Sequence, residues 1–481
     1  MTNQLFTSMK IAEGFFNSQF EPDKNFDLCI KEIMIKNLPT LTVYVSGLVN
    51  GDSLTEILSE LQRDNEEEEI LDEQDYFHAH FNYYGVDLAK SIDDFMLGVL
   101  SGRVGFVTKS GYCYLAEFRN YPGRNPEEPD NEKVIRGSRD GFAENIILNT
   151  ALVRRRIRSE KLRFQMHHVT TYSQTDVVLS YMSDLVNDKH LNWLVERLQQ
   201  IRHDGLTMSD KSLEEWLFKQ KYHPLPFVRY TERPDIVAAH ILEGHIAIMV
   251  DTSPSVMLIP VTMFHLLQHA EEYRQAPLVG TMMRFLRFGA VILSFLLLPF
   301  WYLLVTHPEL LPDKLAFIGI NESGEIPIFL QILIADIGIE YLRIAAIHTP
   351  TPLSTAMGLI AGIIIGQIAI DVGLFSSEIV LYTAITAIFT FAIPNYELSI
   401  SVKVFRLMLL SATALFGING FFIGGFLIFT YLCSLKPMNV PYLWPLVPFF
   451  PKAFARVIIR TPMSEDAPRP FIVNAKKRKR V

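Results

Sequence analysis

The stretch FGAVILSFLLLPFWYLLV (Phe288–Val305) decides the fold class, because it is uncharged and almost long enough to cross a bilayer. A hydrocarbon core about 30 Å thick needs roughly 20 apolar residues per helix. Four more apolar blocks follow at short intervals, namely Ile326–Ile347, Leu353–Leu374, Ile379–Ile393 and Leu407–Cys433. Soluble domains rarely hold such a series, so residues 284–435 are predicted to form an α-helical polytopic membrane domain.

The residues before this domain have an ordinary globular composition and suffice for one or two domains. The three cysteines, Cys29, Cys113 and Cys433, are too few and too scattered for a disulfide framework or a zinc site. The start, MTNQLFTSMK, lacks the apolar core of a signal peptide. The N-terminal region is therefore expected to be soluble and to stay in the cytoplasm.

A repeat appears within this soluble region. The segment TVYVSGLVNGDSLTEILSELQ (from Thr42) aligns without a gap with LSYMSDLVNDKHLNWLVERLQ (from Leu179), at an offset of 137 residues. The identical polar pairs are Ser46/Ser183, Asn50/Asn187 and Gln62/Gln199. Both copies have the pattern of a strand followed by an amphipathic helix. Chance resemblance is the alternative, but the polar identities favour a duplication that gives two related α/β subdomains.

These patterns predict six segments. They are an N-terminal arm (1–27), a first α/β subdomain (28–133), a linker helix with the second α/β subdomain (134–221), a hairpin and helix leading into the membrane (222–283), the membrane domain (284–435) and a C-terminal cytoplasmic tail (436–481). The tail ends in the basic cluster KKRKR (Lys476–Arg480). Beside a membrane domain, such a cluster is expected near anionic lipid headgroups rather than on nucleic acid.

Two charged segments adjoin the second subdomain. They read RGSRDGFAENIILNTALVRRRIR (Arg136–Arg158) and PFVRYTERPDIVAAHILEGHIAIMVDTSP (Pro226–Pro254). Both closely resemble signature blocks of the A subunits of spore germinant receptors, and the resemblance covers nearly the whole chain. The sequence departs from the family pattern at Ser138, where proline is usual. The stretch Gly98–Arg136 resembles the stage V sporulation protein AF branch of the family.

The resemblance implies a multi-pass protein of the inner spore membrane, whose N-terminal region and C-terminal tail face the cytoplasm or spore core. It also implies a homo-oligomeric ring, with a pentamer as one candidate stoichiometry. Such a ring would release monovalent cations during germination, next to other spore germination proteins and membrane lipids. The alternative is a non-conducting scaffold or receptor subunit. A secondary transporter is disfavoured, because its usual repeats lie in the membrane.

Three groups of residues are candidate functional sites. Charges at membrane depth usually mark function, and the intramembrane charges Asp336, Glu340 and Arg343 either ring a cation pathway or belong to an amphipathic surface helix. A GxxxGxxxG motif lets helices approach closely, and it comprises Gly358, Gly362 and Gly366. The opposite face of that helix is a candidate pore lining or gate, formed by Ile360, Ile363, Ile364 and Gln367. Packing inside one subunit is the alternative for both faces.

The third group is the set of charged residues in the two signature blocks. They are predicted subunit or subdomain contacts, with intradomain salt bridges as the alternative: Arg136, Arg139, Asp140, Arg229, Glu232, Arg233 and Asp235. The sequence contains no Walker loop, HExxH or GxSxG motif. His265 and His269 lie one turn apart without a further recognisable ligand. We therefore expect no enzyme, no metal site and no cofactor.

The number of membrane crossings follows from charge. Arg284 and Arg287 place the start of the first block on the cytoplasmic side, and the basic tail places the C-terminus there too. An even number of crossings is required, and four are favoured over five or six. Ile326–Ile347 is the doubtful block because of its charges. The proline-rich stretch VPYLWPLVPFF (Val440–Phe450) is an alternative extra crossing.

Overall fold

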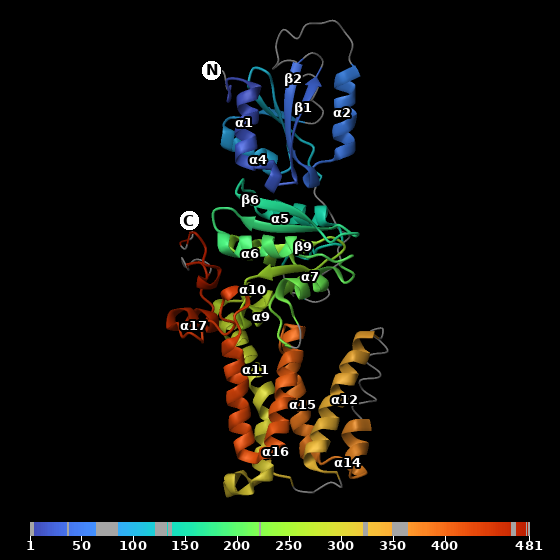
Figure 1. Cartoon of the computed structure of the whole chain (residues 1–481), viewed down its shortest axis with the longest axis vertical. Coiled ribbons are helices and arrows are strands. Elements are labelled where there is room, and N and C mark those ends of the chain that lie inside the picture. The colour runs from blue at the N-terminus through green and yellow to red at the C-terminus, as the bar shows by residue number, and fades with distance from the viewer. Residues whose placement is uncertain are drawn as a thin grey trace. The chain divides into compact units, whose positions relative to one another are not determined.

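The computed structural model describes residues 4–35, 38–63, 85–120, 132, 137–220, 223–320, 326–348, 364–462, 468–477 and 479. The chain folds into two compact units (Figure 1). The first unit comprises Met1–Lys221, Phe227–Val261 and Met463–Val481, and the second comprises Tyr222–Pro226 and Thr262–Pro462. The C-terminal residues therefore belong to the same unit as the N-terminal half.

The first unit begins with a five-stranded antiparallel sheet in the order β1-β2-β4-β5-β3. The strands are β1 (Leu28–Ile35), β2 (Leu38–Val45), β3 (Val86–Leu88), β4 (Val104–Val107) and β5 (Cys113–Ala116). Helices α1 (Met9–Phe20) and α4 (Ile92–Leu100) cover one face, and α2 (Gly51–Arg63) covers the other (Figure 1). Successive side chains of a strand point to opposite faces, which explains the apolar residues at consecutive positions of β4 and β5.

The N-terminal residues contribute to this core rather than forming a free arm. Phe16 and Phe20 of α1 are fully buried. The ring of Phe16 lies 5.3 Å, between centroids, from that of Phe95 on α4. Burying one phenylalanine side chain stabilises a fold by roughly 1.5–3 kcal/mol. Helix α1 is therefore an integral element of the first subdomain.

A second five-stranded antiparallel sheet follows, in the order β6-β7-β9-β10-β8. Its strands are β6 (Leu162–Val169), β7 (Thr175–Met182), β8 (Arg229–Thr231), β9 (Ile246–Val250) and β10 (Val256–Ile259). The helices of this subdomain are α5 (Ile146–Arg156), α6 (Asp188–Gln199), α7 (Ser209–Phe218) and α8 (Pro234–Glu243). Numbered within each sheet, the two strand orders are the same, which confirms the prediction of two related α/β subdomains.

The residues of the repeat occupy equivalent positions in the two subdomains. The side chain of Asn50 accepts a hydrogen bond from the Ser53 amide at the start of α2, at 3.2 Å. That of Asn187 accepts one from the Lys189 amide at the start of α6, at 2.9 Å. Asparagine is a favoured helix N-cap, because its side chain satisfies an amide that has no partner within the helix. The 137-residue offset thus places an asparagine at the start of a helix in each copy.

The C-terminal segment packs on the second subdomain. Ile472 and Val473, in the turn η8 (Phe471–Val473), are buried. A Cβ atom on Gly244, which has a φ of +101°, would lie 3.2 Å from Val473 and 3.1 Å from Ala475. Glycine is therefore needed there both for its backbone conformation and for the close approach of the segment. The chain thus leaves the first unit to form the second, and its C-terminal residues then return to the first unit.

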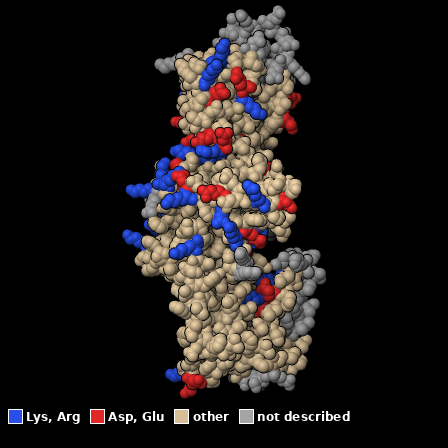
Figure 2. Space-filling model, viewed as in Figure 1, with Lys and Arg blue, Asp and Glu red and all other residues tan. Residues whose placement is uncertain are grey.

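The second unit is helical. Its longer elements are α11 (Pro277–Thr306), α12 (Ile328–His348), α15 (Ser377–Phe391) and α16 (Tyr396–Ser434). Its shorter ones are α9 (Met263–Leu266), α10 (Ala270–Arg274), η4 (Pro308–Leu310), η5 (Asp313–Ile318), η6 (Ile364–Ile368), α14 (Ala369–Asp371), η7 (Pro437–Asn439) and α17 (Pro451–Ile458). Among the described residues, α11 and α16 are long and apolar enough to cross a membrane. On the face shown in Figure 2, charged side chains become sparse over this unit.

Helix α16 reverses direction at Gly417, which has a non-helical backbone with φ +56° and ψ −135°. The rings of Phe405 and Tyr431 lie 6.0 Å apart, whereas a straight helix would separate these residues by about 39 Å. A Cβ atom on Gly424 would lie 3.3 Å from the Cβ of Ala412. Both contact pairs are centred on Ile418, next to Gly417, so Tyr396–Phe416 and Ile418–Ser434 form an antiparallel helical hairpin. Hydropathy alone predicted one block, Leu407–Cys433.

The stretch Val440–Phe450 does not supply a crossing. It forms turns instead of a helix, and Tyr442, Leu443 and Trp444 are buried within the second unit. The main-chain oxygen of Tyr442 accepts a hydrogen bond from the amide of Met263 at 3.0 Å. Closely spaced prolines remove amide donors and prevent a regular helix here. The suggestion of an extra crossing at these residues is therefore wrong.

Candidate functional site

The helical unit holds a buried cluster of charged side chains near the middle of its helices. Nη2 of Arg406, on α16, donates a hydrogen bond to Oδ1 of Asp336, on α12, at 2.7 Å. Nη1 of Arg406 donates to the carbonyl oxygen of Ser294 on α11 at 2.8 Å, and to Oγ1 of Thr390 on α15 at 3.1 Å. One guanidinium group therefore joins α16 to three other helices.

A second cation lies one turn earlier on α16. Nζ of Lys403 donates to the main-chain oxygen of Asp336 at 2.7 Å and to Oε2 of Glu340 at 3.0 Å. Nε of Arg343 donates to Oε1 of Glu340 at 3.0 Å. Nη1 of Arg343 donates to Oγ of Ser399 at 3.0 Å. The structure thus brings together all three predicted intramembrane charges, Asp336, Glu340 and Arg343, and supplies both carboxylates with partners from the same chain.

The polar residues of α12 can contact those of α16 because both sets recur at the same helical spacing. Positions 336, 340 and 343 of α12 meet positions 406, 403 and 399 of α16, so the helices run antiparallel. Residues three and four apart share one face of a helix. Sequence reasoning missed Lys403 and Arg406 because it began the last apolar block at Leu407. The complementary spacing of the two stripes was the signal that could have found them.

The cluster is withdrawn from solvent. The exposed fraction is 2% for Asp336, 1% for Arg406 and 7% for Lys403. Arg406 lies about 15 Å along the helix from Tyr396 and from Phe416 alike, which is the middle of this helix. Three cations face two carboxylates, so the cluster carries one excess positive charge when all its groups are ionised. Removing one partner of a buried pair is strongly destabilising, because the other charge stays uncompensated.

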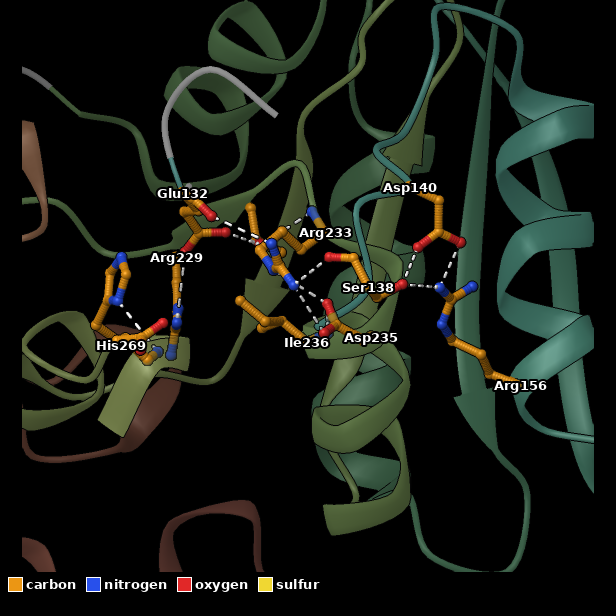
Figure 3. A network of polar contacts seen from close by, with 11 residues as sticks. Glu132, Ser138, Asp140, Arg156, Arg229, Arg233, Asp235, Ile236 and His269 are labelled. Atoms are coloured by element: carbon orange, nitrogen blue, oxygen red, sulfur yellow. Dashed lines mark hydrogen bonds and ion pairs between the residues drawn. The ribbon is translucent and has the colours of Figure 1, made fainter. Parts of the chain in front are cut away.

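A second polar network lies in the first unit and contains most of the predicted contact residues (Figure 3). Arg233, which is 1% exposed, donates to both carboxylate oxygens of Asp235 at 3.1 and 2.9 Å. It also donates to the carbonyl oxygens of Glu132 at 3.2 Å and Ser138 at 3.0 Å. The carboxylate of Glu132 lies 3.6 Å from the guanidinium group of Arg229. Arg233 thus fastens the segment before α5 to the start of α8.

Ser138, the departure from the family pattern, extends this network to α5. Its hydroxyl donates to Asp140 and accepts from Nη2 of Arg156 at 3.0 Å, and Arg156 also pairs with Asp140. Burial raises the pKa of Asp140, but the hydrogen bonds from Arg156 and Ser138 outweigh it and hold this pKa below its ordinary value. Proline at this position would lack the hydroxyl.

The remaining predicted contact residues lie around this network. Glu232 is half-buried, and its main-chain oxygen accepts a hydrogen bond from the Phe142 amide at 2.8 Å. Arg139 is exposed. Arg136 lies outside the described residues. The contacts described above for this network are made within one chain, so a role of these residues between subunits stays a prediction.

The predicted gate lies largely outside the described residues, namely at Gly358, Gly362, Ile360 and Ile363. The described part begins at Ile364, in the π-helical turn η6. Gln367 in this turn is exposed. A Cβ atom on Gly366 would have no described atom within 4 Å. An exposed polar side chain suits a water-facing surface, and the gate stays a prediction.

The two histidines that were weighed as metal ligands have other contacts. Nδ1 of His265 lies 3.0 Å from Oγ1 of Thr262. Nδ1 of His269 accepts a hydrogen bond from the Glu271 amide at 3.2 Å, at the start of α10. Among the residues that the structure describes, no group of three or more His, Cys, Asp or Glu side chains is arranged to hold a metal ion.

Comparison with known proteins identifies the family. The model of the Bacillus/Clostridium GerA spore germination protein family matches residues 15–472. The chain belongs to this family. It is 47% identical to stage V sporulation protein AF of Bacillus subtilis (strain 168) over 470 residues, which cover 97% of this chain and 95% of that protein. Spore germination protein GerLA of Bacillus cereus is 29% identical, over 94% of this chain and 93% of its own. The predicted family and branch are confirmed.

The chain is also similar to a solved structure. That structure is the N-terminal domain of the A subunit of the Bacillus megaterium spore germinant receptor GerK3. The match covers 53% of this chain and 96% of that domain, with 24% sequence identity and a TM-score of 0.42.

Proposed function

We propose that this GerA-family chain is a non-enzymatic subunit of a ring-shaped cation channel in the inner spore membrane, which releases monovalent cations during germination. Family membership supports the role in germination. The observation that carries the channel proposal is the exposed polar side chain of Gln367 on the predicted gate helix, because a polar group in an apolar helical unit suits a water-filled path. The buried cluster around Asp336 and Arg406 would hold the surrounding helices in place. Other germination proteins are the expected partners.

The helical unit supports six crossings rather than the four favoured by the sequence. Arg343, near the end of α12, bonds to Ser399, near the start of α16, whereas Gln331, near the start of α12, bonds to Ser376 just before α15. The chain must therefore return from one end of the unit to the other between His348 and Ser376. Together with α11, α12, α15 and the two halves of α16, the predicted apolar block Leu353–Leu374, which lies largely outside the described residues, would bring the number of passes to six. An even number agrees with both ends on the cytoplasmic side.

In this arrangement, α12 is a transmembrane helix and not a surface helix. Asp336 and Glu340 are compensated by cations of α16, and Arg343 pairs with Glu340 on α12 itself, which lowers the cost of placing these charges in the membrane. The gate is assigned to the helix that contains Gln367, and the charge cluster is assigned to holding the surrounding helices in register. Opening would require movement of the gate helix while the Asp336–Arg406 pair stays intact.

A non-conducting scaffold is the second candidate. It is favoured by the excess positive charge of the cluster and by the fact that both carboxylates bind cations of their own chain. Such a cluster would repel cations if it lined a conduction path. The channel proposal therefore requires that the path lie elsewhere, along the gate helix.

Two measurements separate these candidates. Native mass spectrometry of the detergent-solubilised protein should give a multiple of the 55.0 kDa chain mass, whereas a monomer would remove the central pore. Potassium-loaded liposomes containing the protein should then leak potassium, and Gln367→Leu should change the leak rate while leaving the mass of the complex unchanged. A complex of the expected mass that never conducts, alone or with other germination proteins, would support the scaffold.

A further inference from the structure

The short helix α17 lies against the beginning of α11 and is held there by two arginines. Nη1 of Arg284 donates to the main-chain oxygens of Arg456 and Val457, both at 3.1 Å. The main-chain amide of Arg460 donates to Oγ1 of Thr281 at 3.1 Å, and its Nη2 donates to the Tyr273 carbonyl oxygen at 2.7 Å. Helix α17 therefore has a fixed place at the end of the bundle where α11 begins.

An apolar surface is exposed around this contact. On α11 the exposed residues recur at helical spacing and precede the uncharged stretch that begins at Phe288. They are Leu278, Met282, Phe285 and Leu286, with exposed fractions of 82%, 56%, 56% and 64%. Beside α17 the exposed residues are Phe449, Phe450 and Ile459, at 59%, 42% and 52%. So many large apolar side chains at one end of the bundle indicate a surface that is covered in the native setting.

The length of α11 shows at which depth this surface lies. Its 30 residues extend for about 45 Å, whereas a bilayer core about 30 Å thick takes roughly 20 of them. If the uncharged stretch from Phe288 onward fills the core, the first two to three turns of α11 lie in the headgroup region. Helix α17 packs across these turns and lies at the same depth.

The charges near this surface are positive. Lys452 and Arg456 on α17 are exposed. No Asp or Glu occurs in residues 435–462 or 273–308 of the sequence. The neighbouring Glu272 is fully buried and pairs with Arg284 and Arg287. The exposed cations of α17 therefore have no acidic residue beside them in their own segment.

We propose that α17 and the first turns of α11 form an interfacial anchor that binds the anionic headgroups of the membrane leaflet at this end of the bundle. Amphipathic helices of this kind lie in the plane of the interface, with apolar side chains in the acyl boundary and cations among the phosphates. The exposed apolar side chains lie in the acyl boundary, and Lys452 and Arg456 contact the phosphates. The proposal requires that α11 enters a membrane but does not depend on cation conduction.

The expected basic tail is a weaker candidate for the same role. Nζ of Lys476 donates to Asp188 at 2.7 Å, and Nζ of Lys477 donates to Asp184 at 2.8 Å. These two cations are already paired with carboxylates of the first unit. The lipid contact assigned to the tail by the sequence is therefore reassigned to α17.

The test is hydrogen exchange of the full-length protein in nanodiscs made of phosphatidylcholine, with and without phosphatidylglycerol. Amides of residues 449–459 should exchange roughly 30-fold more slowly when the anionic lipid is present, because Lys452 and Arg456 are both attracted to such a surface. The double variant Lys452→Gln/Arg456→Gln should lose this protection. Lys314→Gln changes an exposed lysine on η5, which lies outside the anchor, and should keep it.

Two results would overturn the proposal. One is equal exchange at residues 449–459 in both lipid compositions. The other is protection that depends on protein concentration but not on the anionic lipid, since that would show a second copy of the chain covering this surface. Circular dichroism of the double variant distinguishes loss of binding from loss of folding.

Discussion

Nη2 of Arg406 lies 2.7 Å from Oδ1 of Asp336, and this contact joins two helices at positions 70 residues apart in the chain. Both side chains are almost fully buried. The same guanidinium group also bonds to α11 and α15, so this contact fixes the relative register of four helices. The pair is therefore the first place to test how the helical unit is held together.

Arg406→Leu leaves the Asp336 carboxylate buried without its main partner. We predict that the helical unit loses about 3–5 kcal/mol of stability, as expected when one member of a buried pair is removed. Unfolding in mixed detergent micelles, followed by the fluorescence of Trp301 in the core of this unit, measures the loss. Asp336→Leu/Arg406→Leu should regain most of it. A double variant as unstable as Arg406→Leu would mean that the two residues do not act as a pair.

Gly417→Ala should destabilise the hairpin of α16 by about 1–3 kcal/mol, because the backbone conformation at φ +56° and ψ −135° strains any residue with a Cβ. Gly425 on the same helix has open space around its Cβ position. Gly425→Ala should therefore be neutral or stabilising by about 0.5–1 kcal/mol. The same unfolding assay compares the two variants, and equal effects at both positions would argue against the reversal.

The hairpin can also be tested by distance. Cysteines placed at positions 405 and 431, in a variant without Cys433, should be joined by a short bifunctional reagent, since the native rings lie 6.0 Å apart. A continuous straight helix would hold these positions about 39 Å apart and prevent the reaction within one chain.

Val473→Asp should destabilise the first unit by about 3 kcal/mol or more, because it buries a carboxylate in a site that is fully closed to solvent. Phe471→Asp is the matched control, since Phe471 is 48% exposed, and should change stability by about 0.5 kcal/mol or less. Thermal unfolding of the full chain, with hydrogen exchange of β7 and β9, reports the effect. No difference between the variants would show that the C-terminal segment leaves this site in solution.

Acid should weaken the first unit through His245, whose pKa is lowered to about 4 by burial. An unfolded histidine has a pKa of about 6.5. Between these values the unfolded state binds a proton that the folded state does not. The contribution of His245 to the free energy of unfolding is therefore fully present above about pH 6.5 and is lost as the pH falls toward 4. Burial also lowers the pKa of His167 and His190.

His245→Leu should therefore reduce the slope of the free energy of unfolding against pH in this window by the contribution of about one proton. The part of the slope that comes from other groups should remain. Chemical unfolding at a series of pH values measures the slope. An unchanged slope would mean that His245 is protonated equally in the folded and unfolded states.

The sequence predicted the soluble fold in some detail because its signals are local and repeated. The 137-residue offset between the copies of Asn50 and Asn187 reappears as two helix N-caps. By contrast, hydropathy could not show that α16 turns back at Gly417, since both halves of the hairpin are equally apolar. Hydropathy averaged along the chain also hid Lys403 and Arg406. Their role depends on contacts with α12, which lies far away in the chain.

The placement of the C-terminal segment depends on tertiary contacts that no local pattern encodes. Lys476 and Lys477 formed part of a basic cluster in the sequence, but their partners are Asp188 and Asp184, almost 300 residues earlier. A cluster of one sign predicts an anionic partner without saying where that partner lies. In this chain the partner is its own second subdomain.

The central claim is that the assembled protein conducts monovalent cations. The most direct measurement is the reversal potential of the current through purified protein in a planar bilayer, with unequal concentrations of potassium chloride on the two sides. We predict a reversal potential close to the equilibrium potential of potassium. The absence of any current in an intact oligomer, or a reversal potential close to that of chloride, would contradict the account.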